Sequence, residues 1–230
     1  ISGVGFDIVP TDCLAAYVAQ QLDEPQVLEL AFATKGGVSG GTTNSMLEII
    51  PKVGIVVRRN GRLVAQRFGQ GAKNVLFSDG KLRHVVPIPW GDLSSSVKST
   101  GIPNVTTYIA YPKLPGMSLG MPVAQALLSV KPLRRVVQTA VNRFVGGPSD
   151  EVRERGKTLV WAKAADAEGN TAEAWLESLE GYTFTAVAGV RAVERILDAS
   201  RPLAGALTPS LAFGPDFVLE ITGTTRYDVL

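Results

Sequence analysis

Two carboxylates, Asp7 and Asp12, lie in a glycine-rich turn at the start of the chain, residues Gly3–Asp12. Pro10 suits the first turn of a helix, and Thr11 or Asp12 can cap that helix. The free N–H groups at a helix start can bind an anion, such as a phosphate or a carboxylate. The glycines equally suit a tight connection between a strand and a helix. The turn therefore predicts either an anion site or a packing contact, and these residues alone favour the packing contact.

A third carboxylate, Asp92, follows a tryptophan in the segment Ile88–Ser96. If the pKa of Asp92 is raised, this residue could position or protonate a substrate. If Asp92 instead accepts N–H bonds from Leu93 to Ser95, its pKa falls and the carboxylate has a structural role. We expect the second arrangement. Trp90 could stack on a flat substrate, or it could anchor a long loop in the core.

The chain has one cysteine, Cys13, and one histidine, His84. A single cysteine cannot form an internal disulfide, which fits a reducing compartment. A single histidine excludes a histidine-based metal cluster, and we expect no metal site. Cys13 could be an activated thiolate in the first turn of a helix, but a buried small residue is the simpler interpretation. His84 fits a partly exposed position on a strand.

The composition is that of a soluble globular protein, with 45% apolar and 19% charged residues in a chain of 230. The formal net charge is +2 and the sequence has no block of Lys or Arg, so we expect no nucleic-acid partner. No apolar run reaches the ~18 residues that a bilayer span needs. We expect a cytoplasmic protein.

The hydrophobic pattern predicts short antiparallel strand units and three good helices, rather than alternating strands and helices. The dipeptide Asn60-Gly61 fits a type I′ turn between two strands, and Pro51 should end the short helix before them. In chain order we expect a helix from about residue 12, a strand at 26–33, a short helix at 46–50, strands within 55–66 and at 75–77 and 82–86, a loop at 87–103, strands at 105–111, 158–165 and 171–176, a helix at 183–199 and a strand at 217–221. The expected fold class is α+β, with a largely antiparallel or mixed sheet flanked by a few helices.

The segment Met121–Val145 has the pattern of a long amphipathic helix, and its basic residues are not balanced by an acid before Asp150. Such a helix can lie on an anionic membrane or in the groove of a partner. More often it packs its apolar stripe on its own domain. Residues 121–156 could form a helical subdomain. By the same periodicity, the helix at 183–199 should bury Val187, Val190, Val193 and Leu197.

Several segments in a fixed order carry a family resemblance, and the third is the most specific. They are Gly3–Asp12, Gly41–Ser45 with Val57–Leu63, Ile88–Ser96 running to Ser99–Asn104, Gly147–Ser149 with Arg155-Gly156, Gly181–Thr183 with Thr185, Leu207–Pro209 and Ala212–Gly214. In this order they resemble the saccharopine dehydrogenase-like oxidoreductases, including the trans-acting enoyl reductase branch. The resemblance covers essentially the whole chain.

The resemblance implies an N-terminal Rossmann domain that binds NAD or NADP, followed by an α+β domain that shapes the substrate site and often a dimer interface. This sequence departs from that pattern, because no Gly-x-Gly-x-x-Gly follows a predicted strand. We therefore expect residues 1–12 to be the exit strand and turn of a missing dinucleotide-binding domain. Residues 13–230 would be the substrate and dimerisation domain, and we expect this chain alone to bind no dinucleotide.

In such an enzyme the nicotinamide carries the chemistry, and the protein supplies orientation and a proton donor. The opening turn would lie near the nicotinamide, which makes Gly5, Phe6 and Asp7 the expected cofactor-binding residues. The catalytic residue is open, with Asp12 and Asp92 as candidates. The expected substrate-binding residues are Thr42, Asn44, Trp90, Ser95 and Thr100. The glycines of residues 36–41 could form a lid over the site or a plain strand–helix connection.

The family implies a reaction at a C=N or a C=C bond of a small-molecule or acyl substrate, and these residues do not choose between the two bonds. A homodimer is expected. A different class of function is a non-catalytic binding or membrane-associated module that docks through residues 121–145, at the periphery of a membrane. A dimerisation scaffold without a small ligand is a third hypothesis.

Overall fold

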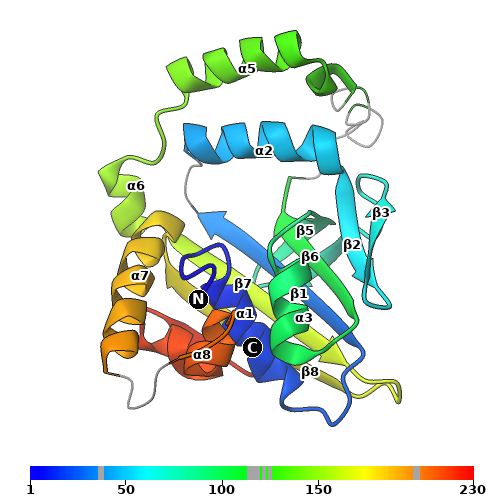
Figure 1. Ribbon diagram of the computed structural model, residues 1–230, viewed down its shortest axis with the longest axis vertical. Coiled ribbons are helices and arrows are strands. Elements are labelled where there is room, and N and C mark those ends of the chain that lie inside the picture. Colours follow the sequence, from blue (N-terminus) through cyan, green and yellow to red (C-terminus); the bar gives the residue numbers. More distant parts are fainter. Residues whose placement is uncertain (36–38, 113–119, 121–122, 124–125, 199–202) are drawn as a thin grey trace.

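The computed structural model describes residues 1–35, 39–112, 120, 123, 126–198 and 203–230. Their strands form one sheet of nine, ordered β3-β2-β6-β1-β7-β8-β9, with β5 paired to β6 and β4 paired to β5 (Figure 1). The pair β1–β6 is parallel and the other described pairs are antiparallel. The strands are β1 (Val27–Lys35), β2 (Ile55–Arg59), β3 (Arg62–Gln66), β4 (Lys73–Leu76), β5 (Leu82–Pro87), β6 (Asn104–Ala110), β7 (Lys157–Ala165), β8 (Thr171–Leu179) and β9 (Thr225–Tyr227). The predicted α+β class with a mixed sheet is confirmed.

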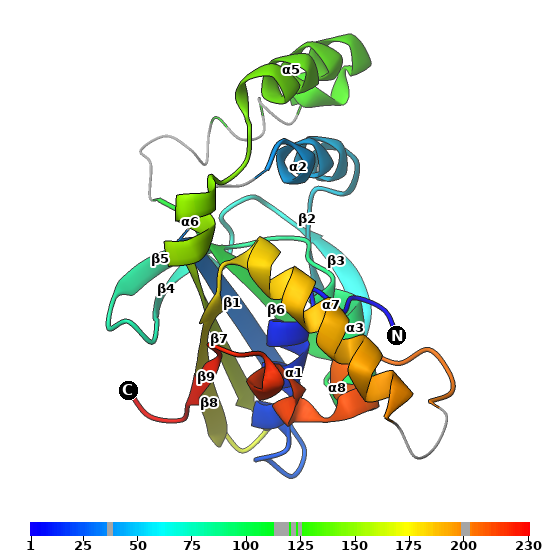
Figure 2. The ribbon, with the colours of Figure 1, turned by 90° about the vertical axis from the view of Figure 1, so that its left-hand side faces the viewer.

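The helices divide into two groups. Helices α1, α3, α7 and α8 gather on one face of the sheet, whereas α2 and α5 stack beyond its end (Figure 2). The helices are α1 (Val9–Ala19), α2 (Gly40–Val53), α3 (Asp92–Thr100), α5 (Lys131–Phe144), α6 (Asp150–Arg155), α7 (Gly181–Leu197), α8 (Pro209–Phe213) and the 3-10 helix η1 (Pro215–Glu220).

Side chains of β1 point alternately into two cores. Leu28, Leu30 and Phe32 join the helix-side core, whereas Ala31 and Ala33 join a second core under the β4–β5 hairpin. Helix α1 is buried along nearly its whole length because its residues are mostly small or apolar. It is therefore the central helix of the larger core, and the opening turn that precedes it is held close to the sheet.

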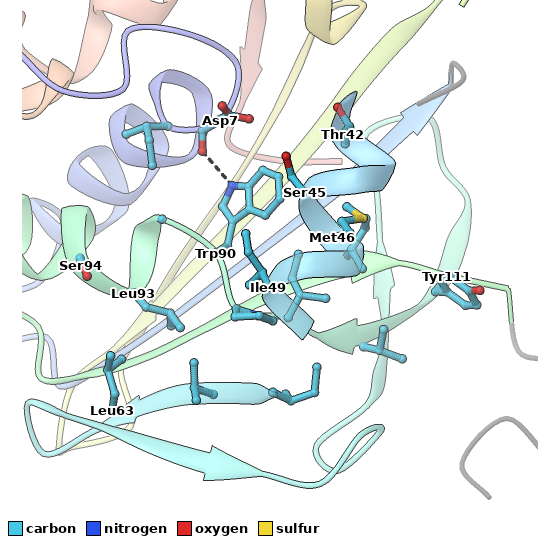
Figure 3. A pocket seen from close by; sticks show the side chains of 18 of the residues that line it. Asp7, Thr42, Ser45, Met46, Ile49, Leu63, Trp90, Leu93, Ser94 and Tyr111 are labelled. Carbon is cyan, nitrogen blue, oxygen red and sulfur yellow. Dashed lines mark hydrogen bonds between the residues drawn. The ribbon is translucent and has the colours of Figure 1, made fainter. Parts of the chain in front are cut away.

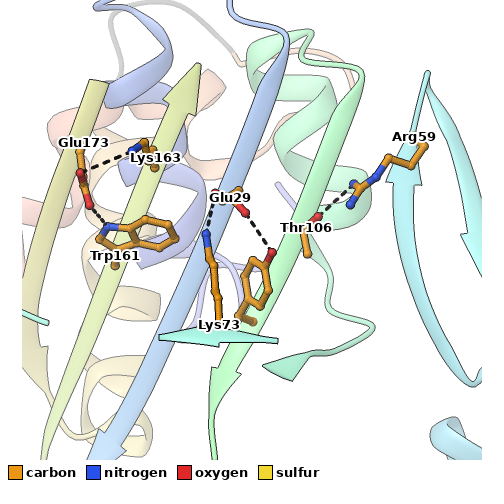
Figure 4. Close-up of polar contacts among 8 residues, drawn as sticks. Glu29, Arg59, Lys73, Thr106, Trp161, Lys163 and Glu173 are labelled. Carbon is orange, nitrogen blue, oxygen red and sulfur yellow. Dashed lines mark hydrogen bonds and ion pairs between the residues drawn. The ribbon is translucent and has the colours of Figure 1, made fainter. Parts of the chain in front are cut away.

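The second face of the sheet carries a network of polar side chains (Figure 4). Lys73 Nζ lies 2.6 Å from a carboxylate oxygen of Glu29, and the Tyr108 hydroxyl donates to the other oxygen at 2.9 Å. The Lys73 ammonium also lies 4.5 Å from the centre of the Trp161 ring. Burial and the neighbouring Glu29 raise the pKa of Tyr108. These groups pair with one another, so the network stabilises the sheet.

The Asn60-Gly61 hairpin is confirmed, with both residues at positive φ, 49° and 74°. The predicted loop at 87–103 is wrong, because it contains α3. Serine-rich sequences have modest helix propensity, which hid this helix. In α3 the serine hydroxyls bond to carbonyls one turn back, as Ser99 does to Ser95 at 3.0 Å. Helix α2 also continues past Pro51 to Val53, because a proline removes one hydrogen bond without forbidding a final turn.

The buried face of α7 differs from the predicted stripe. Phe184, Ala188 and Ala192 are buried, whereas the four predicted residues are exposed: Val187, Val190, Val193 and Leu197. Alanines let the helix approach the core closely, so the small side chains face inward. The predicted strand at 217–221 is also wrong. Its buried residues are spaced as in a helix and form η1, and the last strand is β9.

The predicted helix at 121–145 is broken at Val130, which has an extended backbone, and α5 begins at Lys131. Residues 121–122 and 124–125 of that prediction lie outside the described residues. No residue of α5 is buried. The helix rests on α2 and not on the sheet (Figure 1).

Candidate functional site

A cavity of about 730 Å³ lies between α2 and the sheet (Figure 3). Its walls come from α2, β2, β3, β5, β6 and the segment that leads into α3. Most of the lining is aliphatic or aromatic, and none of the described lining residues carries a positive charge. The apolar lining residues are Ile8, Met46, Ile49, Ile55, Val56, Leu63, Phe68, Val86, Ile88, Pro89, Trp90, Leu93, Ile109 and Tyr111. The size and lining suit an apolar ligand of some length.

Trp90 forms one wall of this cavity. Its indole N–H donates to the backbone carbonyl of Asp7 at 2.8 Å (Figure 3). The ring packs against Phe32 with 4.9 Å between the ring centres. Trp90 thus joins the opening turn to β1 and the start of α3, and its position is fixed by one polar and one aromatic contact. The carboxylate of Asp7 is exposed at the same junction.

A smaller pocket of about 110 Å³, which we call the annex, adjoins the cavity. Asp7, Thr42, Met46, Trp90 and Ile109 line both spaces. The remaining annex residues come from the opening turn, β1, β7 and the start of α7: Phe6, Phe32, Thr34, Lys157, Thr158, Glu180, Gly181, Tyr182 and Thr185. The annex therefore adds several polar side chains beside an apolar cavity.

Thr158 presents an unpaired group to the annex. Its residue is only 1% exposed, and its hydroxyl oxygen has no hydrogen-bond partner in the described structure. A buried hydroxyl without a partner costs roughly 1–3 kcal/mol. A hydrogen-bond partner would remove that cost.

The Tyr182 hydroxyl lines the annex and has a lowered pKa. It accepts the Ser39 N–H at 2.8 Å and shares a hydrogen bond of 2.9 Å with the Thr42 hydroxyl. Burial opposes ionisation, but these hydrogen bonds outweigh burial and lower the pKa of Tyr182. A phenol with a lowered pKa is a better proton donor near neutral pH.

Glu180 holds Tyr182 in this position. It is 4% exposed, and its carboxylate accepts the N–H groups of Tyr182 at 3.0 Å and Thr183 at 3.2 Å. Glu180 is therefore the N-cap of α7. The hydroxyl of Thr185, one turn further on, accepts the Phe6 N–H at 3.0 Å. The start of α7 and the opening turn are thereby joined around the annex.

The predicted site residues fall into two groups. Asp7, Thr42 and Trp90 line both spaces, and Phe6 lines the annex. Others lie outside the lining: Gly5, Asp12, Asn44, Asp92, Ser95 and Thr100. Asn44 donates to Asn142 of α5 at 2.6 Å. The Thr100 hydroxyl donates to the Ser96 carbonyl and accepts the Ile102 N–H. Whether any of these residues touches a substrate stays a prediction.

The two candidate catalytic carboxylates are both fully buried. Asp12 accepts the Ser210 N–H at 2.8 Å and the Ser99 hydroxyl, so it joins α1 to α8 and α3. The prediction that Asp92 has a lowered pKa is wrong. Burial raises its pKa, and hydrogen bonds from Thr11 and Ser95 offset this only in part. One of its carboxylate oxygens has no partner in the described structure.

Cys13 is buried, which confirms the small-residue interpretation, and burial raises the pKa of its thiol. His84 lies on β5 and is partly exposed, as predicted. Within the described residues, no group of three or more His, Cys, Asp or Glu side chains could hold a metal ion. Residues 36–38 of the predicted lid lie outside the described residues.

Tyr182, Glu180 and Thr158 were missed as site residues from the sequence. The sequence does contain a hint of Glu180 and Tyr182. A carboxylate directly before a helix can cap the first N–H groups of that helix, and here the cap follows the end of a strand. For Thr158 the sequence holds no signal, since its isolation depends on the packing around it.

No protein-family model and no curated protein matches this sequence. Among solved structures, the chain is similar to the apo histidine-tagged saccharopine dehydrogenase (L-Glu forming) from Saccharomyces cerevisiae, with a TM-score of 0.55 and 11% sequence identity. The match covers 95% of this chain and 71% of that chain. At this identity the likeness establishes a shared fold, which agrees with the fold expected from the family resemblance.

Proposed function

We propose that this chain is the substrate-binding domain of a nicotinamide-dependent oxidoreductase that acts on the polar end of an apolar, acyl-like substrate. One observation carries the proposal: an apolar cavity of about 730 Å³ meets a polar annex at Thr42 and Trp90. The fold similarity to saccharopine dehydrogenase supports the class of reaction.

The lining favours a C=C bond of an enoyl substrate over the C=N bond of a dicarboxylate. A dicarboxylate needs cationic partners, and the described lining of the cavity has none. The annex contains Lys157, whose ammonium is already paired with Glu177. An acyl tail needs only apolar surface, which the cavity supplies. This supports the enoyl reductase branch of the family.

The residues of this chain do not fit a whole nicotinamide dinucleotide. The sequence has no Gly-x-Gly-x-x-Gly after a strand. The glycines of the opening turn are close-packed, since a Cβ on Gly5 would lie 2.8 Å from the Thr185 methyl. We propose that a separate domain holds the NAD or NADP and docks against the turn Gly5, Phe6 and Asp7. A homodimer also stays a prediction, which sedimentation velocity can check.

We assign proton delivery to the Tyr182 hydroxyl. Reduction of a double bond adds a hydride and a proton, and the hydride belongs to the nicotinamide of the separate domain. Tyr182 has a lowered pKa, a polar pocket in front of it and a fixed position on the capped end of α7. Trp90 then forms the wall where the tail ends and the reactive group begins.

A fluorescent fatty acid tests the proposal. Cis-parinaric acid should bind the chain with a saturable rise in fluorescence, because burial removes it from water. Trans-2-hexadecenoic acid should displace it, whereas glutaric acid should not. Absence of saturable binding, or displacement by glutaric acid alone, would sink the proposal of an acyl-like substrate.

A parallel titration with NADPH tests where the cofactor is held. We expect no saturable change in nucleotide fluorescence with this chain. Tight NADPH binding by the chain would refute the assignment of the dinucleotide to a separate domain, while leaving the acyl site untouched.

A further inference from the structure

Helix α5 rests on α2 through a side that carries both polar residues and valines. Asn142 accepts the side-chain N–H of Asn44 at 2.6 Å, and Gln138 donates to Glu48 at 3.3 Å. The backbone also comes close, since a Cβ on Gly40 would lie 3.0 Å from the Val145 carbonyl. The half-buried residues of α5 are Arg134, Val137, Gln138 and Val141, so this side of the helix faces the protein. Figure 2 shows α5 beside α2.

The outer face of α5 is apolar and uncovered in the described structure. Leu133 is 39% exposed, Val136 66% and Phe144 79%. Residues spaced three or four apart share one side of a helix. The outer face consists of such residues: Leu133, Val136, Ala140 and Phe144. An amphipathic helix normally buries this side, so the outer face, which no described residue covers, is available for a further contact.

The charges of α5 identify the kind of contact. Its four charged residues are all cations: Lys131, Arg134, Arg135 and Arg143. The sequence has no Asp or Glu from residue 112 to residue 149. In the described part of the chain, none of the four cations forms an ion pair. At 3.6 residues per turn Arg143 lies on the flank of the outer face, whereas Lys131 and Arg135 lie on the opposite side of the helix. A cationic helix with an apolar face is the pattern of a helix that lies on an anionic lipid surface.

We propose that α5 docks this protein on an anionic lipid bilayer. The outer face enters the boundary between headgroups and acyl chains, Arg143 at its flank reaches lipid phosphates and carboxylates, and the other cations add to the attraction by the anionic surface. Within the described residues, no helix is both long enough and apolar enough to cross a membrane. Helix α5 would lie in the plane of the membrane surface.

A second copy of the chain is a poorer occupant of the outer face. A two-fold symmetric contact would bring together two helices that each carry four cations and no acid. A helix of 14 residues is only about 21 Å long, whereas a stable interface buries roughly 1,600 Å² in total. Charge and size therefore both favour a lipid surface.

The inference stands on α5 alone. Where the proposed function also holds, the two are connected through α2, because α5 rests on α2 while Thr42, Met46 and Ile49 of α2 line the cavity. Docking would bring α2, which lines the cavity, close to a membrane that contains acyl chains.

Vesicle flotation tests the docking. The chain should float with vesicles of phosphatidylcholine and phosphatidylserine at low salt, and high salt should release it. Vesicles of phosphatidylcholine alone should bind much less. The substitution Arg143→Gln should weaken binding about fivefold, since each cation near such a surface contributes about 1 kcal/mol.

A matched pair of variants separates this contact from general stickiness. Val136→Asp on α5 should abolish flotation, whereas Val190→Asp on α7 should leave it unchanged, since the two valines are similarly exposed at 66% and 62%. Equal binding to both vesicle types, or flotation that survives Val136→Asp, overturns the proposal. A dimer that Val136→Asp dissociates would also overturn it. The fatty-acid displacement assay is independent of these outcomes.

Discussion

The two spaces beneath α2 share a wall but differ in the polar side chains that they offer a ligand. The cavity is lined mostly by aliphatic and aromatic side chains, whereas the annex adds hydroxyls, a phenol, a carboxylate and an ammonium to its apolar lining. Met46 and Trp90 face both spaces. A molecule with an apolar tail and a polar reactive end fits the pair better than it fits either space alone.

The difference between the two spaces separates affinity from specificity. Burying an apolar tail contributes about 25 cal/mol per Å² and depends little on direction. A hydroxyl such as that of Thr158, buried without a partner, costs roughly 1–3 kcal/mol until a ligand atom meets it in one geometry. The cavity is therefore expected to set how tightly a ligand binds, and the annex to set which end is held.

Filling the shared wall should have the largest effect on binding. Met46→Trp adds bulk where the two spaces meet, and overpacking of ~2 kcal/mol would weaken cis-parinaric acid binding about 30-fold. A fluorescence titration measures the change. Leu82→Trp, at a position that is exposed on β5, is the control and should leave binding unchanged. Equal effects of the two variants would remove the cavity from the proposal.

Replacing Asp92 tests whether a carboxylate that lines neither the cavity nor the annex affects stability alone. Its pKa is raised by burial, so the folded protein keeps a proton on Asp92 at pH values where the unfolded chain has released it. Stability from this group is therefore full below the ordinary pKa of aspartate and is lost as pH rises through the raised pKa.

Asp92→Asn should consequently stabilise the protein by roughly 1–2 kcal/mol at pH values above the raised pKa of Asp92, and it should flatten the dependence of stability on pH. Urea denaturation at mildly acidic and mildly alkaline pH measures both changes. Binding of cis-parinaric acid should stay the same. A loss of binding would return Asp92 to the list of site residues.

Tyr182 tests the polar end. Because hydrogen bonds lower the pKa of Tyr182, ultraviolet titration should show one tyrosine that ionises earlier than the ordinary phenol, and Tyr182→Phe should remove that phase. The variant should also lose about 1 kcal/mol of stability with its contacts to Ser39 and Thr42. Tyr111→Phe, at the far side of the cavity, serves as the control. If the early phase survives Tyr182→Phe, the lowered pKa belongs to another tyrosine.

Thr158→Val should have the smallest effect. The two side chains have nearly the same shape, so the change removes only the unpaired hydroxyl and should stabilise the protein by up to ~1 kcal/mol. Affinity for hexadecenoic acid should fall about threefold, while affinity for hexadecane should not change. A stability loss would show that the hydroxyl has a partner, and the annex would then lack its clearest polar signal.

Much of the fold could be predicted because it follows local rules. The hairpin at Asn60-Gly61, the pair β7–β8 and the strand β1 each have a short-range pattern of turn residues or alternating side chains. Helix α3 was missed because its serines satisfy themselves within the helix, which no apolar period reveals. On α7 the buried face was misjudged because packing chose Ala188 and Ala192 over the larger valines.

The site could be predicted only in part. Asp7, Thr42 and Trp90 lie in segments with unusual residues, and the structure brings them to one junction. The cavity itself has no local pattern, because its lining comes from positions between Asp7 and Tyr111 that meet only after folding. Tyr182 owes its lowered pKa to Ser39 and Thr42, about 140 residues earlier in the chain, and no spacing rule links them.

A crystal structure with trans-2-hexadecenoic acid would test the acyl site most directly. We predict that the hydrocarbon tail lies in the cavity against Met46 and Leu63, and that the carboxyl end passes Trp90 to meet Thr158 and Tyr182 in the annex. An empty cavity, or a ligand bound with its polar end in the cavity and its tail outside, would contradict the proposal.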